Sequence, residues 1–107
     1  MREQTENRVI GFLGLCMRAG RIVSGQEACV DLIRRKEAAL VLLDGSASDN
    51  TRKRIVDACH SHDAPAWELS ENALGHAIGK EGRMVIALRD DGMAQNLLTL
   101  LKDEERL

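Results

Sequence analysis

The sequence predicts an α/β protein in which helices cover both faces of a small sheet. Two observations lead to this fold class. Apolar residues switch along the chain between the spacing of amphipathic helices and short unbroken runs that are typical of buried strands. The segments follow one another as a helix and then repeated strand–helix units. We therefore expect a three-layer α/β/α sandwich around a mixed, largely parallel sheet of about four strands.

The size of the chain fits one domain over residues 1–107. Of its 107 residues 44% are apolar, which is enough to build a core, and the scarcity of aromatic residues makes that core aliphatic. Only residues 103–107, at the end of the chain, are expected to fray.

The first helix is predicted over residues 5–19, where apolar side chains recur every three or four positions. Gly20 stands where a helix C-terminal glycine is expected. Ile22-Val23 is predicted to be a very short strand. Residues 24–27 match a capping box, because a serine precedes a glutamate by three positions, and they predict the start of a second helix.

The middle of the chain repeats the strand–helix order. An unbroken apolar run over residues 40–43 predicts a strand that is covered on both faces. Residues 46–49 can start a third helix, which shows the cations at 52–54 on its outer face. After Pro65, a short strand is predicted over residues 66–69.

The last third of the chain contains one more buried strand between two helices. Ser70 is expected to cap a brief helix that includes Leu74. Residues 84–88 form the second fully apolar run and predict a strand. Asp90 and Asp91 are expected to begin the final helix, because acidic side chains favour a helix N-terminus.

The distribution of charge is more informative than the net charge of −2. Residues 1–54 hold ten Lys/Arg and seven Asp/Glu, whereas residues 55–107 hold five and ten. An RNA-facing basic patch is therefore expected in the first half. The chain has only two aromatic residues, and this scarcity argues against nucleic-acid binding by base stacking. No apolar run approaches the length of a membrane span and the first residues are polar, so we expect a cytoplasmic protein.

The cysteines are expected to be core residues. Cys16, Cys29 and Cys59 are widely spaced, and each falls on the apolar face of a predicted helix. Cys59 and His62 share a helix face and could ligate a metal, but no second ligand pair accompanies them. We therefore expect neither a metal nor another cofactor.

Two segments are candidates for a binding site. Arg18 and Arg21 flank a turn that leads to Gly25, where a new helix begins with unpaired N–H groups; this combination suits a phosphate-bearing ligand. The glycine-rich residues 75–83 add the cations Lys80 and Arg83.

Other interpretations of the second segment are weaker. The glycine spacing over residues 79–82 matches the GxxG loop of KH domains, but a strand rather than a helix is predicted to follow it. His76 could serve as a general base, yet no nucleophile or orienting carboxylate is visible for it, so we do not expect an enzyme.

Over residues 7–102 the chain resembles the kink-turn-binding ribosomal-protein superfamily of the L-seven-Ae and L-thirty-e type, in particular its small bacterial YlxQ-like branch. The fold implied by this resemblance is an α/β/α sandwich. The motifs that carry it are Leu13-Gly-Leu15, Arg18-Ala-Gly-Arg21, Ser24-Gly25, the run 38–43 followed by Asp44, Ala47-Ser48, Asn50-Thr51, Leu74-Gly75 and Ile78-Gly79-Lys80.

The resemblance implies an RNA site made of two segments. By matching positions these are Arg18, Arg21, Gly25, Gln26, Glu27, Ala28 and Asp31, and then Gly79, Lys80, Glu81 and Gly82. Members of the family recognise a sharply kinked internal loop by its shape and a few base edges. Strong kink-turn binders carry Asn or Lys, then Glu or Gln, and then Lys where this chain has Glu27, Ala28 and Asp31.

Three functions follow from these expectations. The first is a small non-enzymatic RNA-binding protein of the ribosome or translation apparatus, with structured RNA, including ribosomal RNA, as its partner and with Arg18, Arg21, Lys80 and Arg83 on phosphates. The second is a protein–protein module on the same scaffold, with a partner in the translation apparatus. The third is an accessory domain that acts with an RNA-modifying enzyme.

Overall fold

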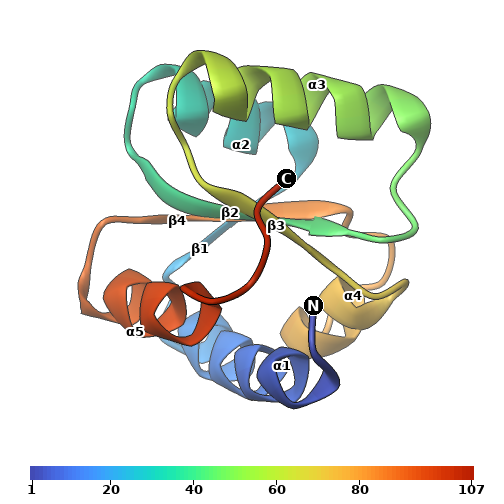
Figure 1. Ribbon diagram of the computed structural model, residues 1–107, viewed down its shortest axis with the longest axis vertical. Helices are drawn as coiled ribbons and strands as arrows, with labels where there is room; N and C mark the ends of the chain where they lie inside the picture. Colours follow the sequence, from blue (N-terminus) through green and yellow to red (C-terminus); the bar gives the residue numbers. More distant parts are fainter.

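The structure, a computed structural model, describes all residues 1–107. It contains five helices and four strands that alternate along the chain (Figure 1). Their bounds are α1 Glu3–Arg18, β1 Ile22–Ser24, α2 Gln26–Arg34, β2 Ala38–Asp44, α3 Asp49–Ser61, β3 Ala66–Leu69, α4 Ala73–Ile78, β4 Val85–Arg89 and α5 Gly92–Leu101. No helix combines the length and the apolar character needed to cross a membrane.

The four strands form one mixed sheet in the order β1-β4-β2-β3. Only β2 and β3 pair in parallel, whereas β4 lies between β1 and β2 and runs antiparallel to both. The predicted mixed sheet is confirmed, but the expectation that it is largely parallel is wrong. The antiparallel position of β4 has a functional consequence, because it places the start of β4 beside the end of β1.

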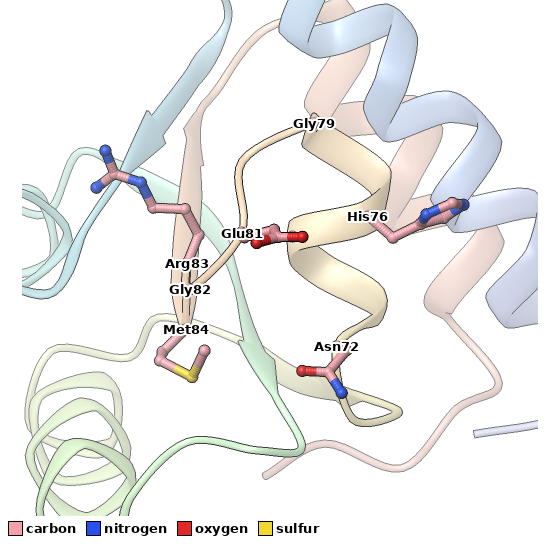
Figure 2. Close-up of a pocket in the computed structure, with 8 residues that line it drawn as sticks. Asn72, His76, Gly79, Glu81, Gly82, Arg83 and Met84 are labelled. Carbon is pink, nitrogen blue, oxygen red and sulfur yellow. The ribbon is translucent and has the colours of Figure 1, made fainter.

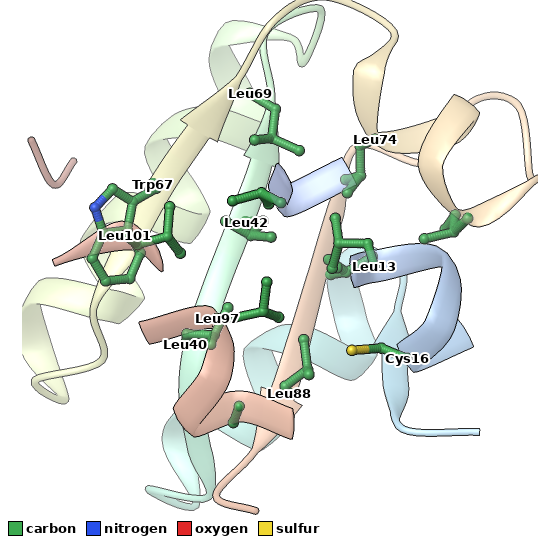
Figure 3. Close-up of a cluster of buried hydrophobic side chains, with 14 residues drawn as sticks. Leu13, Cys16, Leu40, Leu42, Trp67, Leu69, Leu74, Leu88, Leu97 and Leu101 are labelled. Atoms are coloured by element: carbon green, nitrogen blue, oxygen red, sulfur yellow. The ribbon is translucent and has the colours of Figure 1, made fainter. Parts of the chain in front are cut away.

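Helices cover both faces of the sheet, as predicted. In Figure 1, α2 and α3 lie on one face and α1, α4 and α5 on the other. Successive residues of β2 alternate between the two cores: Leu40 and Leu42 belong to the cluster beneath α1 and α5, and Val41 and Leu43 to the cluster beneath α2 and α3. Figure 3 shows the larger, mainly leucine cluster, with the buried Trp67 at one edge of it.

Most helix ends follow their predicted signals. Gly20 takes a positive φ of 70° after α1, and the N–H groups of Gly20 and Arg21 donate to Met17 and Cys16 in the pattern of a Schellman motif. Asp91 caps α5, because its carboxylate accepts a hydrogen bond from the N–H of Ala94.

Two predicted caps are wrong. Ser24 lies in β1, and the N-cap of α2 is Gly25, which has no side chain to offer. Ser70 does not cap α4 but donates its hydroxyl to Glu6 of α1. The residue before α4 is Asn72, which has a left-handed φ of 66°. Its side chain makes no capping hydrogen bond.

The start of α4 is instead held by a carboxylate from another element. Asp44, at the end of β2, is fully buried and accepts hydrogen bonds from the N–H groups of Ser46, Asn72 and Leu74. Burial opposes ionisation of Asp44, but these bonds and one from the Ser46 hydroxyl outweigh it and lower the pKa of the carboxyl. Asp44 thus ties the loop before α4 to the centre of the sheet.

All three cysteines are buried thiols, as expected for core residues. Burial raises the pKa of Cys29 to about 12 and that of Cys59 to about 11. The Nδ1 of His62 lies 3.0 Å from the carbonyl oxygen of Ala58, within its own helix. The side chains of Cys59 and His62 therefore serve the core and the helix end respectively.

The C-terminal residues pack along β3 rather than fray. The N–H of Leu107 donates to the carbonyl oxygen of Ala66, and Trp67 Nε1 donates to the carbonyl oxygen of Glu104. The Glu104 carboxylate in turn accepts from the backbone N–H and the guanidinium of Arg2. The expectation that residues 103–107 fray is wrong because these contacts join both ends of the chain to the sheet.

We predict that the pairing of Arg2 with Glu104 makes the stability of the fold depend on pH in the acidic range. Hydrogen bonds from Arg2 lower the pKa of Glu104 to about 2. The stabilisation is therefore fully present above the ordinary glutamate pKa of about 4.3 and is lost as the pH falls towards the folded value. Glu104→Gln should flatten the loss of melting temperature between pH 5 and 2. Glu105→Gln, at an exposed neighbour, should leave the wild-type slope unchanged.

Candidate functional site

The first part of the site is the junction between β1 and α2. Gly25 has φ 101° and ψ 148°, a conformation that is essentially restricted to glycine. Its N–H donates to the carbonyl oxygen of Val85 at the start of β4. A Cβ on Gly25 would lie 3.4 Å from Nη1 of Arg83. The start of α2 is therefore in direct contact with the segment that leads into β4.

The helix that begins here leaves donors free. No side chain caps α2, and its first intrahelical backbone bond runs from the N–H of Cys29 to the carbonyl oxygen of Gly25. The N–H groups of residues 26–28 are therefore left for solvent or a ligand, at the positive end of the helix dipole.

The second part of the site is the loop between α4 and β4. Gly79 and Gly82 both take positive φ, at 72° and 77°, a conformation that glycine adopts without strain. Gly75 serves a different purpose: a Cβ there would lie 2.8 Å from the carbonyl oxygen of Lys80, so the loop packs closely on α4. A strand follows the loop, as expected, and not the helix that a KH domain requires.

Two neighbouring hollows open along this loop. The larger has a volume of about 660 Å³ and lies between α4 and the loop (Figure 2). In Figure 2 the side chain of Arg83 extends away from α4, towards β1. The smaller, of about 220 Å³, is lined by Gly25, Gln26, Thr51, Gly82, Arg83, Met84 and Val85. Residues that flank Arg83 thus line both hollows.

The smaller hollow, here called the α2–β4 groove, also includes the first turn of α3. Thr51 Oγ1 donates to Gln26 Oε1 at 2.9 Å, which fixes the glutamine side chain at the rim. The N–H of Thr51 is itself held by the N-cap Ser48. The groove therefore has walls from α2, from the loop before β4 and from α3.

The predicted cations do not all gather at this groove. Arg83 is half-buried beside Gly25, and Lys80 is exposed on the loop. Arg18 Nη1 lies near Gly14 at the contact between α1 and α4, where the carbonyl oxygen of Ala77 is also close. None of the ion pairs in the structure includes Arg18, Lys80 or Arg83, so their charges are available to a ligand.

Arg21 lies at the opposite end of β1. Its Nη1 is 4.0 Å from Asp91 at the start of α5. Because β1 pairs antiparallel with β4, Ile22 lies opposite Leu88, whereas Gly25 bonds to Val85 at the other end of β4. The structure does not bring Arg21 to Arg83.

The acidic residues of α2 form ion pairs. Asp31 pairs with Arg35 one turn later, at 3.3 Å, which is the spacing at which ion pairs form along one face of a helix. Glu27 does not act in a capping box; its carboxylate receives two hydrogen bonds from the guanidinium of Arg54 in α3. Ala28 and Glu81, the remaining predicted site residues, are exposed.

The arrangement suits a polyanion that also offers polar edges. Three available cations, a row of free N–H groups and a shallow groove can hold phosphates, while Glu27 and Gln26 can accept hydrogen bonds from bases. His76 is exposed at the larger hollow. The structure holds no group of three or more His, Cys, Asp or Glu side chains placed to bind a metal ion.

Comparison with known proteins supports the fold and the family. RNA-binding protein YlxQ of Bacillus subtilis (strain 168) is 43% identical over 91 residues, which cover 84% of this chain and 91% of that protein. RNA-binding protein YlxQ of Enterococcus faecium is 33% identical over 103 residues, with coverage of 95% and 99%.

Solved structures share the same architecture. A protein of unknown function from Bacillus halodurans C superimposes with a TM-score of 0.81 at 32% identity, covering 90% of this chain and 98% of the other. The Giardia lamblia 15.5kD RNA binding protein matches the fold with a TM-score of 0.76 at 18% identity and coverage of 97% and 91%. The family model of ribosomal protein L7Ae/L30e/S12e/Gadd45 matches residues 8–98, and the chain belongs to this family.

Proposed function

We propose that this protein binds structured RNA with a kink-turn-like internal loop, without catalysing a reaction, as part of the ribosome or the translation apparatus in the cytoplasm. Membership of the family and the RNA-binding names of its YlxQ relatives support RNA as the ligand. The observation that carries the proposal is the contact between the glycine that opens α2 and Arg83 of the loop before β4. It joins, in one groove, a row of unpaired N–H groups and an available cation.

Each part of the groove has a role in this proposal. Arg83 and the N–H groups at the start of α2 bind phosphates on either side of a bend in the RNA backbone. Lys80 and Arg18 extend the positive surface along α4 and α1. The side chain of Gln26, fixed by Thr51, reads a base edge within the groove.

The direct test is a titration against three RNAs at several salt concentrations. A kink-turn RNA, a straight duplex of equal length and bulk ribosomal RNA separate shape-specific from nonspecific binding. We expect the kink-turn RNA to bind most tightly, with a log–log salt slope of about −2 to −4 if roughly three to five phosphates are neutralised. Failure to bind any of the three at low salt would end the proposal. In that case a protein partner that survives nuclease treatment in a pull-down would support the protein–protein module.

Arg83→Gln should weaken binding of the kink-turn RNA about tenfold and reduce the magnitude of the salt slope by about 0.7 to 0.9, because one phosphate contact is lost. Arg89→Gln is the matched control. Arg89 is an exposed arginine at the other end of β4, far from Gly25, and carries the same charge. We expect its replacement to change affinity by no more than about twofold. Equal effects of the two variants would place the RNA elsewhere on the surface.

A further inference from the structure

The ion pair between Glu27 and Arg54 lies at the edge of the α2–β4 groove. Both terminal nitrogens of Arg54 donate to the carboxylate of Glu27, one of them at 2.9 Å. The pair bridges α2 and α3 and remains open to solvent: the side chain of Arg54 is 40% exposed and that of Glu27 is 72% exposed. Glu27 therefore occupies the guanidinium fork with the same two-oxygen geometry that a phosphate would use.

Arg54 lies beside the groove, one turn along α3 from a residue that lines it. Thr51, which lines the groove and holds Gln26, lies three residues earlier in α3. Residues three positions apart share a helix face, so Arg54 lies on the same side of α3 as Thr51. Glu27 follows Gln26 directly at the start of α2. The ion pair between Glu27 and Arg54 therefore lies next to the hydrogen bond between Thr51 and Gln26.

We propose that Arg54 is a further phosphate-binding residue of this site and that Glu27 is its intramolecular competitor. The proposal rests on the proposed RNA function. In the free protein Glu27 holds the guanidinium of Arg54; in the complex a backbone phosphate takes its place. Glu27 is then left beside the RNA without its partner and requires a donor, such as a guanine or cytosine amino group.

Physical considerations support such an exchange. A solvent-exposed ion pair contributes little to stability, so breaking it changes the affinity by less than about fivefold. A phosphate carries a full negative charge and fits the fork as well as a carboxylate does. The competing carboxylate also makes binding selective. A polyanion that has phosphates but no amino group near Glu27 can pair with Arg54, but it then faces the unpaired carboxylate of Glu27.

The neighbouring arginine of α3 offers a matched comparison. Arg52 also pairs with a glutamate, Glu68 of β3. The side chains of Arg52 and Glu68 are 31% and 38% exposed, respectively. That pair joins α3 to β3, whereas the pair of Arg54 joins α3 to the start of α2 beside the groove. Replacing Arg52 therefore removes the same charge from the same helix and also frees one glutamate, but leaves the groove intact.

The test measures the affinity for the kink-turn RNA and its salt slope in Arg54→Gln, Arg52→Gln, Glu27→Gln and Glu68→Gln, each checked for folding by thermal unfolding. We expect Arg54→Gln to weaken binding about tenfold and to reduce the magnitude of the slope by about 0.7 to 0.9, and Arg52→Gln to stay within about twofold. Glu27→Gln should strengthen binding by about twofold to fivefold, because the competitor is removed, whereas Glu68→Gln should not.

The outcomes separate this inference from the proposed function. Equal effects of Arg54→Gln and Arg52→Gln would show that Arg54 acts only through long-range charge and would overturn the inference. Weaker binding by Glu27→Gln would likewise overturn the role of Glu27 as a competitor. If neither the wild type nor Glu27→Gln binds any RNA at low salt, the proposed function itself fails.

Discussion

Replacing Asp44 by asparagine is expected to lower the free energy of unfolding by about 3 kcal/mol, because a buried charge-assisted hydrogen bond is lost and a buried donor is left unpaired. The two carboxylate oxygens of Asp44 serve different partners: Oδ1 accepts from the N–H of Leu74, and Oδ2 accepts from Ser46 and Asn72. The amide of asparagine turns one of these acceptors into a donor. Whichever way the amide is oriented, one N–H group at the start of α4 then faces another donor.

Urea unfolding of Asp44→Asn against wild type, with Asp63→Asn as control, measures this loss. Asp63 is exposed and has a left-handed φ of 56°, which asparagine tolerates, so the control should unfold at the wild-type midpoint. The pH dependence gives a second check. Because the folded pKa of Asp44 is lowered, its stabilisation is present above the ordinary aspartate pKa of about 3.9 and is lost as the pH falls through the folded value. A variant as stable as the control would contradict the assigned role of Asp44.

Asp44 also shows what a sequence can and cannot predict about this fold. The resemblance includes this residue as part of a motif, but its role as a cap for α4 depends on a contact between elements far apart in the chain. Ser70, the local candidate, fits the capping rule equally well and is used by Glu6 instead. Local signals identify that a helix begins, whereas the partner that satisfies its first N–H groups is chosen by tertiary packing.

The direction of the strands cannot be inferred from the sequence for a related reason. The runs that form β2 and β4 are apolar throughout, because both faces of the sheet are covered, and such runs carry no information on direction or order. Helix spacing is more informative: α1 is predicted over residues 5–19 and is found at Glu3–Arg18. The layers of the sandwich could therefore be predicted, while the pairing of β4 with β1 could not.

The two segments of the candidate site were predictable, but the contribution of α3 was not. Gly25 and Arg83 are both expected from the sequence as site residues, and they lie in contact. Arg54 has only its place in the basic run 52–54 as a signal, and an exposed helix face explains that run equally well. Its pairing with Glu27 depends on how α2 packs against α3, which the separate sequence patterns of the two helices do not specify.

The acidic residues of α2 lead to the largest change in RNA binding that we predict. Glu27→Asn combined with Asp31→Lys should strengthen binding of the kink-turn RNA about thirtyfold, or about 2 kcal/mol. Two carboxylates are removed from the helix that faces the RNA, one cation is added, and the loss of Glu27 releases Arg54 towards phosphate. The new residues are those that the resemblance to kink-turn binders implies for tight binding at these positions.

The control is Glu37→Asn combined with Asp103→Lys, which makes the same change of net charge away from the groove. Glu37 is exposed after α2, and Asp103 is exposed after α5. If charge alone attracts the RNA, both double variants gain affinity equally and with the same dependence on salt. A gain confined to the α2 variant, and greater for the kink-turn RNA than for the duplex, requires that the start of α2 touches the bent part of the RNA. An unchanged affinity in that variant would move the binding surface away from α2 altogether.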